Sequence, residues 1–323
     1  MAWQEVEQKL ETLLNGKGLE EPEQYDEAPE NLQPVKLKKS VSYIVLAVIF
    51  NEQKDVLVIQ EAKQECYGKW YLPAGRMELN ESIIEAMKRE VQEETGLECE
   101  PRTLLAVQEH GPSWIRYVFL AETTGGTLKT TEEADAESLQ ATWWDRITSL
   151  SLRASDILPL IDLALQYQDH PSHPLTLPHQ IACTVVSQRL LVTFSTHTED
   201  LWVLLAAEGS PHLPVTACGS TFAESRISIR VPLYRLLKHV LPDVKLQTRG
   251  ILALQHLGKA PAGTADGICL NLLVSVRHNE AVESATPPAI HREGFQWFPV
   301  PNGTVKSHLL QRLSTNTVVP LHS

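Results

Sequence analysis

The chain has 323 residues, 43% of them hydrophobic, with 40 acidic against 28 basic residues and a formal net charge of −12. This apolar fraction is enough for packed cores in two domains. The negative charge excludes a general binder of nucleic-acid backbones, which needs a basic surface to displace counterions, but it is compatible with binding phosphate through a metal ion.

The N-terminus and the cysteines predict a cytoplasmic protein. The first residues are acidic and lack the basic segment and apolar core of a signal peptide. No apolar run reaches the roughly 18 residues of a membrane span. The five cysteines are scattered without a CxxC pair, which predicts free thiols in a reducing compartment. We therefore expect neither a membrane nor a nucleic-acid polymer as partner.

Residues 1–36 predict an N-terminal helix followed by an acidic linker. Val6, Leu10 and Leu13 recur at helical spacing, and Gly16 follows them. The next stretch, LEEPEQYDEAPENLQPV, is rich in Glu and Pro and has no periodicity. We expect it to be a mobile, solvated linker.

Residues 37–168 predict a first α/β domain. The runs VSYIVLAVIF and DVLVIQEA are typical of strands, as are TLLAVQEH, IRYVFLAET and ATWWDR further along. The segment ASDILPLIDLALQYQ predicts a closing helix capped by Ser155 or Asp156. Strands, a central helix, further strands and a closing helix predict an α/β sandwich.

The central helix lies in LPAGRMELNESIIEAMKREVQEETGLE, residues 72–98. Asn80 or Glu81 can cap its start, and Gly96 is placed as its stop. Gly75 sits in a Pro-Ala-Gly turn, where glycine allows an unusual backbone conformation.

Three glutamates crowd one side of this helix. Glu90, Glu93 and Glu94 are three and four residues apart, so their carboxylates project together and repel one another. They are either a solvated face paired with Lys88 and Arg89, or hard oxygen ligands for Mg²⁺ or Mn²⁺.

The spacing decides between these interpretations. Residues 75–97 match the pattern Gly-x5-Glu-x7-Arg-Glu-aliphatic-x-Glu-Glu-x-Gly-aliphatic without a departure. This stretch resembles the signature of the Nudix hydrolases, and its flanks are similar to MutT-like members. The resemblance implies an α/β/α sandwich with a mixed sheet and Mg²⁺- or Mn²⁺-dependent hydrolysis of a nucleoside diphosphate derivative, with a small-molecule nucleotide as partner.

The same resemblance implies roles for individual residues. Glu90, Glu93 and Glu94 would be metal ligands together with the carbonyl of Gly75, and Arg89 would orient the glutamates. Two further residues would support the loop–helix–loop, namely Glu81 and Gly96. The general base is expected at Glu137, then Glu133, in the loop before the last strand; solvated loop acids are the alternative.

The substrate pocket is expected outside this motif. Aromatic side chains that could stack on a purine, or belong to the core instead, are Trp70, Tyr71, Trp114, Tyr117 and Trp143. Asp156 could accept from a purine N–H, or be an ordinary N-cap.

The wider wording resembles MutT-like members that act on oxidised purine nucleotides. It implies cleavage of 8-oxo-dGDP and 8-oxo-GDP to the monophosphate and phosphate, which would sanitise the nucleotide pool. The alternative is a nucleotide-sensing or protein-interaction module on the same scaffold. The intact glutamates favour the enzyme, because a pure binder has no use for three adjacent acids without metal.

The remaining chain predicts a Pro/His linker at 169–180 and a second α/β domain at 181–318. Stretches of the first domain recur there in order: DVLVIQEA as DLWVLLAA, YLPAG as HLPVT, LLAVQEHG as ILALQHLG, IRYVFLAET as ICLNLLVSV, and TWWDR as QWFPV. Where the glutamates belong, the chain reads RVPLYRLLKHVLPD. We interpret this domain as a degenerate Nudix-like repeat that could mediate protein contacts; an unrelated α/β domain is the alternative.

Overall fold

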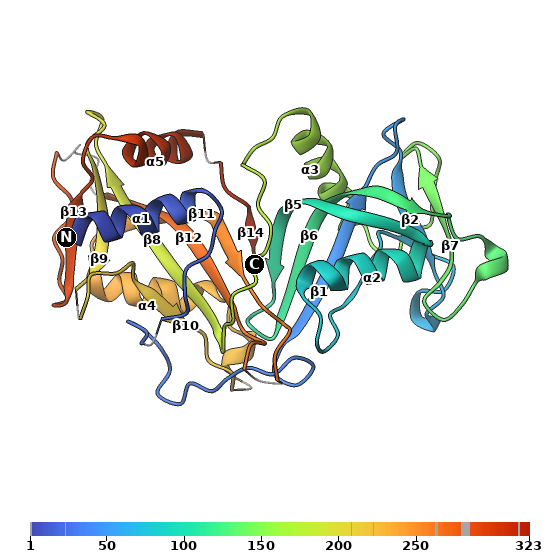
Figure 1. Cartoon of the computed structure of the whole chain (residues 1–323), viewed down its shortest axis with the longest axis horizontal. Helices are drawn as coiled ribbons and strands as arrows, with labels where there is room; N and C mark the ends of the chain where they lie inside the picture. The colour runs from blue at the N-terminus through green and yellow to red at the C-terminus, as the bar shows by residue number, and fades with distance from the viewer. Residues whose placement is uncertain are drawn as a thin grey trace.

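Two α/β units lie side by side along the long axis of the molecule (Figure 1). This computed structural model describes residues 2–22, 24–207, 209–221, 223–261, 264–278, 285–315 and 317–323. We call the elements from β1 to α3, with β14, the first unit and those from β8 to α5, with α1, the second unit. No helix in the described ranges has the length and apolar character needed to cross a membrane.

The first unit is built on a mixed sheet in the order β14-β5-β6-β1-β4, in which β1 runs parallel to β6 and antiparallel to β4. A smaller sheet has the order β3-β2-β7. The strands are β1 (Ser42–Ile49), β2 (Val56–Glu61), β3 (Trp70–Tyr71), β4 (Ala74–Arg76), β5 (Leu97–Glu109), β6 (Trp114–Gly126), β7 (Ser138–Trp144) and β14 (Leu321–His322). Helices α2 (Ile83–Thr95) and α3 (Ile157–Asp169) cover opposite faces, which confirms the predicted α/β/α sandwich.

Helix α2 begins and ends where side-chain chemistry dictates. Ser82, not Asn80 or Glu81, is its N-cap and forms a capping box with Glu85. Asn80 instead takes a left-handed backbone conformation in the loop before it. Gly96 ends the helix in the left-handed conformation, as expected, and a side chain there would also overlap the carbonyl oxygen of Thr127.

The second unit has a six-stranded sheet in the order β11-β12-β8-β9-β13, with β10 paired to β8. Its strands are β8 (Val186–Ser195), β9 (Leu201–Ala206), β10 (Val215–Ala217), β11 (Val244–Gln255), β12 (Ile268–His278) and β13 (Phe295–Pro299). Helix α4 (Arg230–Val240) packs on one face, and helices α1 (Ala2–Leu14) and α5 (Thr304–Thr315) pack on the other.

The strand pairings of the second unit repeat those of the first. Strands β11 and β12 pair antiparallel as β5 and β6 do, and β12 runs parallel to β8 as β6 does to β1. The pairing of β10 with β8 matches that of β4 with β1, and that of β13 with β9 matches that of β7 with β2. A helix follows β10 and β13 just as α2 and α3 follow β4 and β7. The second unit is therefore a repeat of the first, as the sequence predicted.

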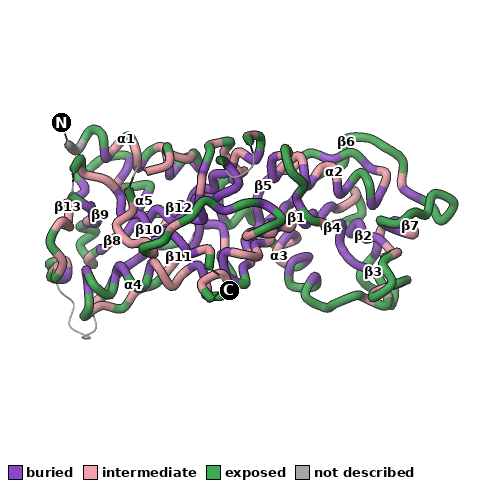
Figure 2. Tube along the Cα trace, turned by 90° about the horizontal axis from the view of Figure 1, so that it is seen from below, coloured by how far each residue is buried: buried purple, intermediate pink, exposed green. Residues whose placement is uncertain are grey.

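A continuous hydrophobic core joins the two units. It includes residues of α2, such as Met87 and Val91, and residues of α4, such as Leu233 and Leu237. The buried stretches run through both sheets, and exposed ones lie in the outer loops (Figure 2).

The prediction of a mobile acidic linker is wrong, because Glu21, Asp26, Glu27 and Val35 bond to the second unit. The carboxylate of Glu21 accepts from the backbone and the hydroxyl of Thr184, at 2.7 and 3.0 Å. Asp26 and Glu27 pair with β10, through Asp26 N to Val215 O (2.8 Å) and Ala217 N to Glu27 O (2.9 Å). These backbone bonds make the linker an added edge of the second sheet.

Candidate active site

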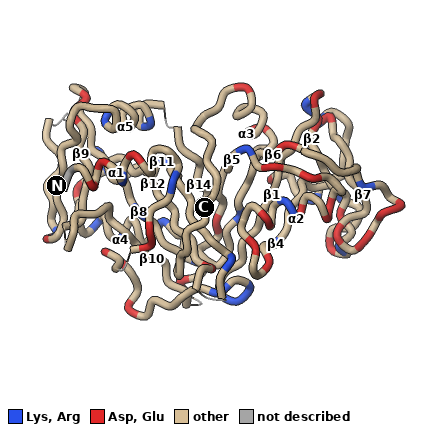
Figure 3. Tube along the Cα trace, in the orientation of Figure 1, with Lys and Arg blue, Asp and Glu red and all other residues tan. Residues whose placement is uncertain are grey.

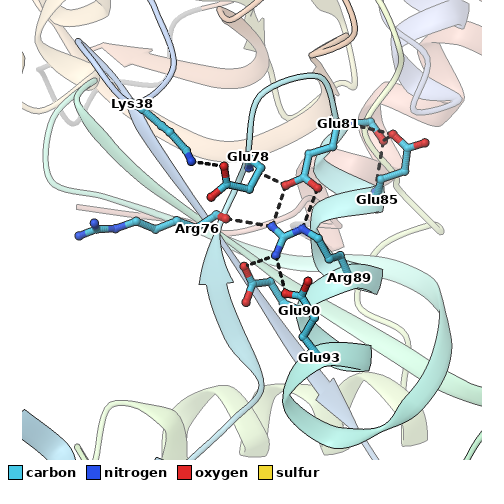
Figure 4. A network of polar contacts seen from close by, with 9 residues as sticks. Lys38, Arg76, Glu78, Glu81, Glu85, Arg89, Glu90 and Glu93 are labelled. Carbon is cyan, nitrogen blue, oxygen red and sulfur yellow. Dashed lines mark hydrogen bonds and ion pairs between the residues drawn. The ribbon is translucent and has the colours of Figure 1, made fainter. Parts of the chain in front are cut away.

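A single arginine, Arg89, binds Glu90 and Glu93 of α2 and Glu81 in the loop before it (Figure 4). Arg89 donates from Nε and Nη2 to the two carboxylate oxygens of Glu81, at 2.9 and 2.8 Å. Its Nη1 donates to Glu90 Oε1 (2.8 Å) and Glu93 Oε2 (2.9 Å), and Nη2 also reaches the carbonyl of Arg76. These charge-assisted bonds raise the pKa of Arg89, first through Glu81.

Glu90 and Glu94 turn inward against strand β4. The N–H of Ala74 donates to Glu94 Oε2 at 2.9 Å, and Glu94 is 1% exposed. A side chain at Gly75 would overlap the carboxylate of Glu90. A side chain at this position would therefore displace the Glu90 carboxylate. Gly75 lies in β4 opposite Val45, not in the unusual backbone conformation expected from its turn.

Burial dominates the electrostatics of these two glutamates. Loss of hydration raises the pKa of Glu94 well above the usual glutamate value, and the bond from Ala74 only partly offsets it. Burial also raises the pKa of Glu90, against the attraction of Arg89 and with a contribution from the charge of Glu137. A cation bound beside β4 would offset the cost of burying these two carboxylates in their charged form.

The donor set suits a hard divalent cation. Glu90, Glu93, Glu94 and the Gly75 carbonyl offer only oxygen atoms, the ligand type that Mg²⁺ and Mn²⁺ prefer. Glu61, at the end of β2, adds a carboxylate that is 2% exposed, and its buried Oε2 has no hydrogen-bond partner among the described residues. The described residues contain no ready-made cluster of three ligands, because Arg89 holds Glu90 and Glu93 and β4 holds Glu94.

The candidates for the general base differ in their surroundings. Glu137 is exposed and lies close enough to Glu90 for its charge to raise the pKa of that carboxyl. Glu133 closes a capping box with Thr130, which donates to its Oε2 from the backbone and the hydroxyl. That local task separates Glu133 from the α2 cluster. Acidic residues gather around α2 and in the turn before β7 (Figure 3).

Part of the predicted substrate set forms a second polar cluster. Tyr71 donates from its hydroxyl to Asp156 Oδ2 at 2.9 Å, and Arg116 donates to both, also at 2.9 Å. The Arg116 guanidinium lies over the ring of Trp114, 5.7 Å from its centroid. Asp156 is the N-cap residue of α3, one of the two predicted, but its side chain makes no capping bond and instead accepts from Tyr71 and Arg116.

Arg153 connects this cluster to the buried carboxylate of Glu61. Its guanidinium lies 4.9 Å from the centroid of the Tyr71 ring and donates to Glu61 Oε1 at 2.7 Å. Arg116, Arg153 and Glu61 were not foreseen from the sequence. Alternation along the strands would have placed Arg116 beside the predicted aromatics, but the sequence carried no signal for Arg153 or Glu61.

The remaining aromatic candidates do not join the cluster. Tyr117 is fully buried and packs edge-on against Tyr43, so it belongs to the core and is not placed to stack on a purine. Trp143 packs against the core on the α2 side, and Trp70 against the core on the α3 side.

The corresponding place in the second unit lacks the acidic side chains of α2. There the sequence of α4 contains no acidic residue. Thr216 stands in β10 where Gly75 stands in β4, and the bridge from Glu27 of the linker covers its edge. Arg235 of α4 forms an ion pair with Glu27. The acids of α2 are therefore dispensable for this fold, which indicates that they serve chemistry.

Comparisons with known proteins show the family of this chain. The sequence model described as NUDIX domain matches residues 42–159. The chain is 50% identical to the 8-oxo-dGDP phosphatase NUDT18 of Homo sapiens over 97% of each chain, and 49% identical to that of Mus musculus over 99% of each. It is 46% identical to the putative nudix hydrolase 1 of Caenorhabditis elegans, over 42% of this chain and 39% of that protein. A solved NUDIX hydrolase from Nitrosomonas europaea is 26% identical with a TM-score of 0.34, over 46% of this chain and 78% of that chain.

The raised pKa of Glu94 makes a prediction for stability without metal. A carboxyl whose pKa is raised by folding contributes stability below its unfolded pKa, near 4.5, and loses it as the pH rises through the folded pKa. We expect Glu94→Gln, which cannot ionise, to raise the melting temperature in EDTA by at least about 2–4 °C at pH 8, the shift that 1 kcal/mol produces in a domain of this size.

This gain should vanish near pH 4.5, and Mg²⁺ should raise the melting temperature of the wild type more than that of the variant. Differential scanning calorimetry across pH measures both effects. A variant that is less stable than the wild type at pH 8 would contradict the dominant role of burial.

Proposed function

The chain belongs to the Nudix family of hydrolases, and we propose that it hydrolyses oxidised purine nucleoside diphosphates, such as 8-oxo-dGDP and 8-oxo-GDP, to the monophosphate and phosphate. The observation that carries the proposal is the complete glutamate–arginine cluster on α2, in a chain that is similar to 8-oxo-dGDP phosphatases over nearly its whole length. The family uses a divalent metal, and we propose Mg²⁺ or Mn²⁺ here.

Glu90, Glu93, Glu94 and the Gly75 carbonyl would hold the metal. When bound, the cation neutralises phosphate oxygens and lowers the pKa of water for in-line attack on phosphorus. Arg89 fixes the directions of Glu90 and Glu93, and Glu81 fixes Arg89 by a two-pronged bond. Glu137 is exposed beside this cluster and could accept the proton of the attacking water.

The second polar cluster supports nucleotide recognition. Arg116 and Arg153 offer guanidinium groups that suit phosphate oxygens, and Trp114 offers a partly exposed ring for a base. Asp156 retains acceptor capacity beyond the bonds from Tyr71 and Arg116, because a carboxylate has about four lone-pair sites. An 8-oxopurine presents an N7–H donor where guanine presents an acceptor, so a carboxylate favours the oxidised base.

The test is a panel of nucleoside di- and triphosphates, oxidised and normal, assayed with Mg²⁺ or Mn²⁺. We expect the highest kcat/KM for 8-oxo-dGDP and 8-oxo-GDP, with release of orthophosphate identified by mass spectrometry. Glu93→Gln should bind nucleotide but lose more than about 100-fold in kcat, since even residues behind metal ligands cost 10–100-fold. Full turnover by Glu93→Gln would refute the metal-site assignment. Nucleotide binding without turnover in the wild type would favour the alternative, a nucleotide sensor.

A second prediction concerns Asp156. Asp156→Asn loses the charged acceptor, and a hydrogen bond to a charged group is worth about 1.5–3 kcal/mol. We expect KM for 8-oxo-dGDP to rise about tenfold or more while kcat changes little. The control is Asp162→Asn, an exposed position on the same helix. Equal effects of both variants, or a loss confined to kcat, would contradict a role in base recognition.

A further inference from the structure

The second unit touches the first at the loop that leads into α2. Gly258 lies between β11 and β12 in a left-handed conformation, with φ of 72°, and a side chain there would overlap the carbonyl oxygen of Glu81. Beside it, Lys259 forms an ion pair with Glu85 in the first turn of α2. The turn of the second unit therefore lies backbone to backbone against the loop that carries Glu81.

The first unit makes the same contact in return. Gly111, between β5 and β6, has a φ of 78°, and a side chain there would overlap the carbonyl oxygen of Ser225. Ser113 donates to that oxygen from its hydroxyl at 2.7 Å, and Ser225 lies in the short 3-10 helix Glu224–Arg226 before α4. Gly111 and Gly258 end the matched stretches LLAVQEHG and ILALQHLG. The units thus exchange one contact reciprocally, as two subunits do across a two-fold axis.

Further bonds hold the Gly258 turn of the second unit against the first unit. Asp266, which follows it, accepts from the N–H of Leu37 at 3.1 Å through its side chain and from the hydroxyl of Tyr43 at 2.7 Å through its carbonyl. The ring of His256 packs edge-on against Tyr43, with ring centroids 5.5 Å apart. His256 and Tyr43 are both buried, so this side of the interface excludes water.

Only one of the two reciprocal contacts leads to a helix that carries acidic side chains. Arg89 donates two hydrogen bonds to Glu81 and one each to Glu90 and Glu93, all at 2.8–2.9 Å. Ser225 precedes α4, whose sequence RVPLYRLLKHV contains no acidic residue. The two contacts have the same form, but only the Gly258–Glu81 contact can position the acidic side chains of a helix.

We propose that the Gly258 turn is a positioning element for the metal-binding glutamates. The second unit takes the place of a second subunit, and it fixes the Glu81 loop and through it the directions of Arg89, Glu90 and Glu93. The kinetic consequences rest on the proposed hydrolase function, whereas metal binding without substrate does not depend on it.

The test compares Gly258→Ala with Gly111→Ala in the full chain, and Gly303→Ala serves as a control in open space. Mn²⁺ binding is measured by electron paramagnetic resonance without nucleotide, together with kcat, KM and melting temperature. We expect Gly258→Ala and Gly111→Ala to have a lower melting temperature than the wild type. Only Gly258→Ala should weaken Mn²⁺ binding and lower kcat by about 10-fold or more, the range seen when supports of metal ligands are lost, with KM within about twofold.

Unchanged Mn²⁺ binding in a folded Gly258→Ala, or an equal loss in Gly111→Ala, would overturn the proposal. Should Gly258→Ala fail to fold, the exposed Lys259 gives the answer: Lys259→Glu should weaken Mn²⁺ binding and Lys259→Arg should retain it, and equal binding by both overturns the proposal. Weak Mn²⁺ binding by Gly258→Ala, in a protein inactive on every nucleotide of the panel, would leave this inference standing and remove the proposed function.

Discussion

The site depends on one guanidinium held between three carboxylates. Arg89 meets both oxygens of Glu81 and one oxygen each of Glu90 and Glu93. Without a cation, Glu90 and Glu93 on adjacent turns of α2 would repel one another, and Glu90 would carry its charge at 7% exposure. The arginine supplies that positive charge and its planar fork sets the geometry. The crowding that makes the helix unusual as a sequence is thus already compensated within the chain, and a divalent metal would add to a neutralisation that Arg89 has begun.

Much of this site could be predicted because its signal is local. The spacing of Glu90, Glu93 and Glu94 fixes their common side on a helix, and Gly96 ends that helix by a rule that needs only neighbouring residues. The repeat was also visible, because strands retain their apolar pattern when catalytic residues are lost. The cap was misassigned for a similar reason: Asn80, Glu81 and Ser82 are all plausible caps, and only the geometry of the loop selects Ser82.

The features that sequence reasoning missed are contacts between distant segments. Arg153 reaches Glu61 across 92 positions of the chain, and the Glu21 carboxylate reaches Thr184 across 163. Composition made the linker look solvated, because it is rich in Glu and Pro and has no periodicity; the partners of Glu21 and Glu27 in the second unit lie far along the chain. Tyr117 was predicted from its place on the same hairpin as Trp114; alternation sets the two on opposite faces of β6, but does not say which face lies against a core.

The two ends of the chain are interlaced with the opposite units. Helix α1, which comes first, packs in the core of the second unit, and strand β14, which comes last, pairs with β5 of the first unit. During synthesis on the ribosome, α1 must therefore wait for most of the chain before its core exists. The first sheet gains its edge strand only when residues 321–322 have emerged. The core of the second unit therefore needs α1 from a distant part of the chain, and the sheet of the first unit takes its edge strand β14 from beyond the second unit.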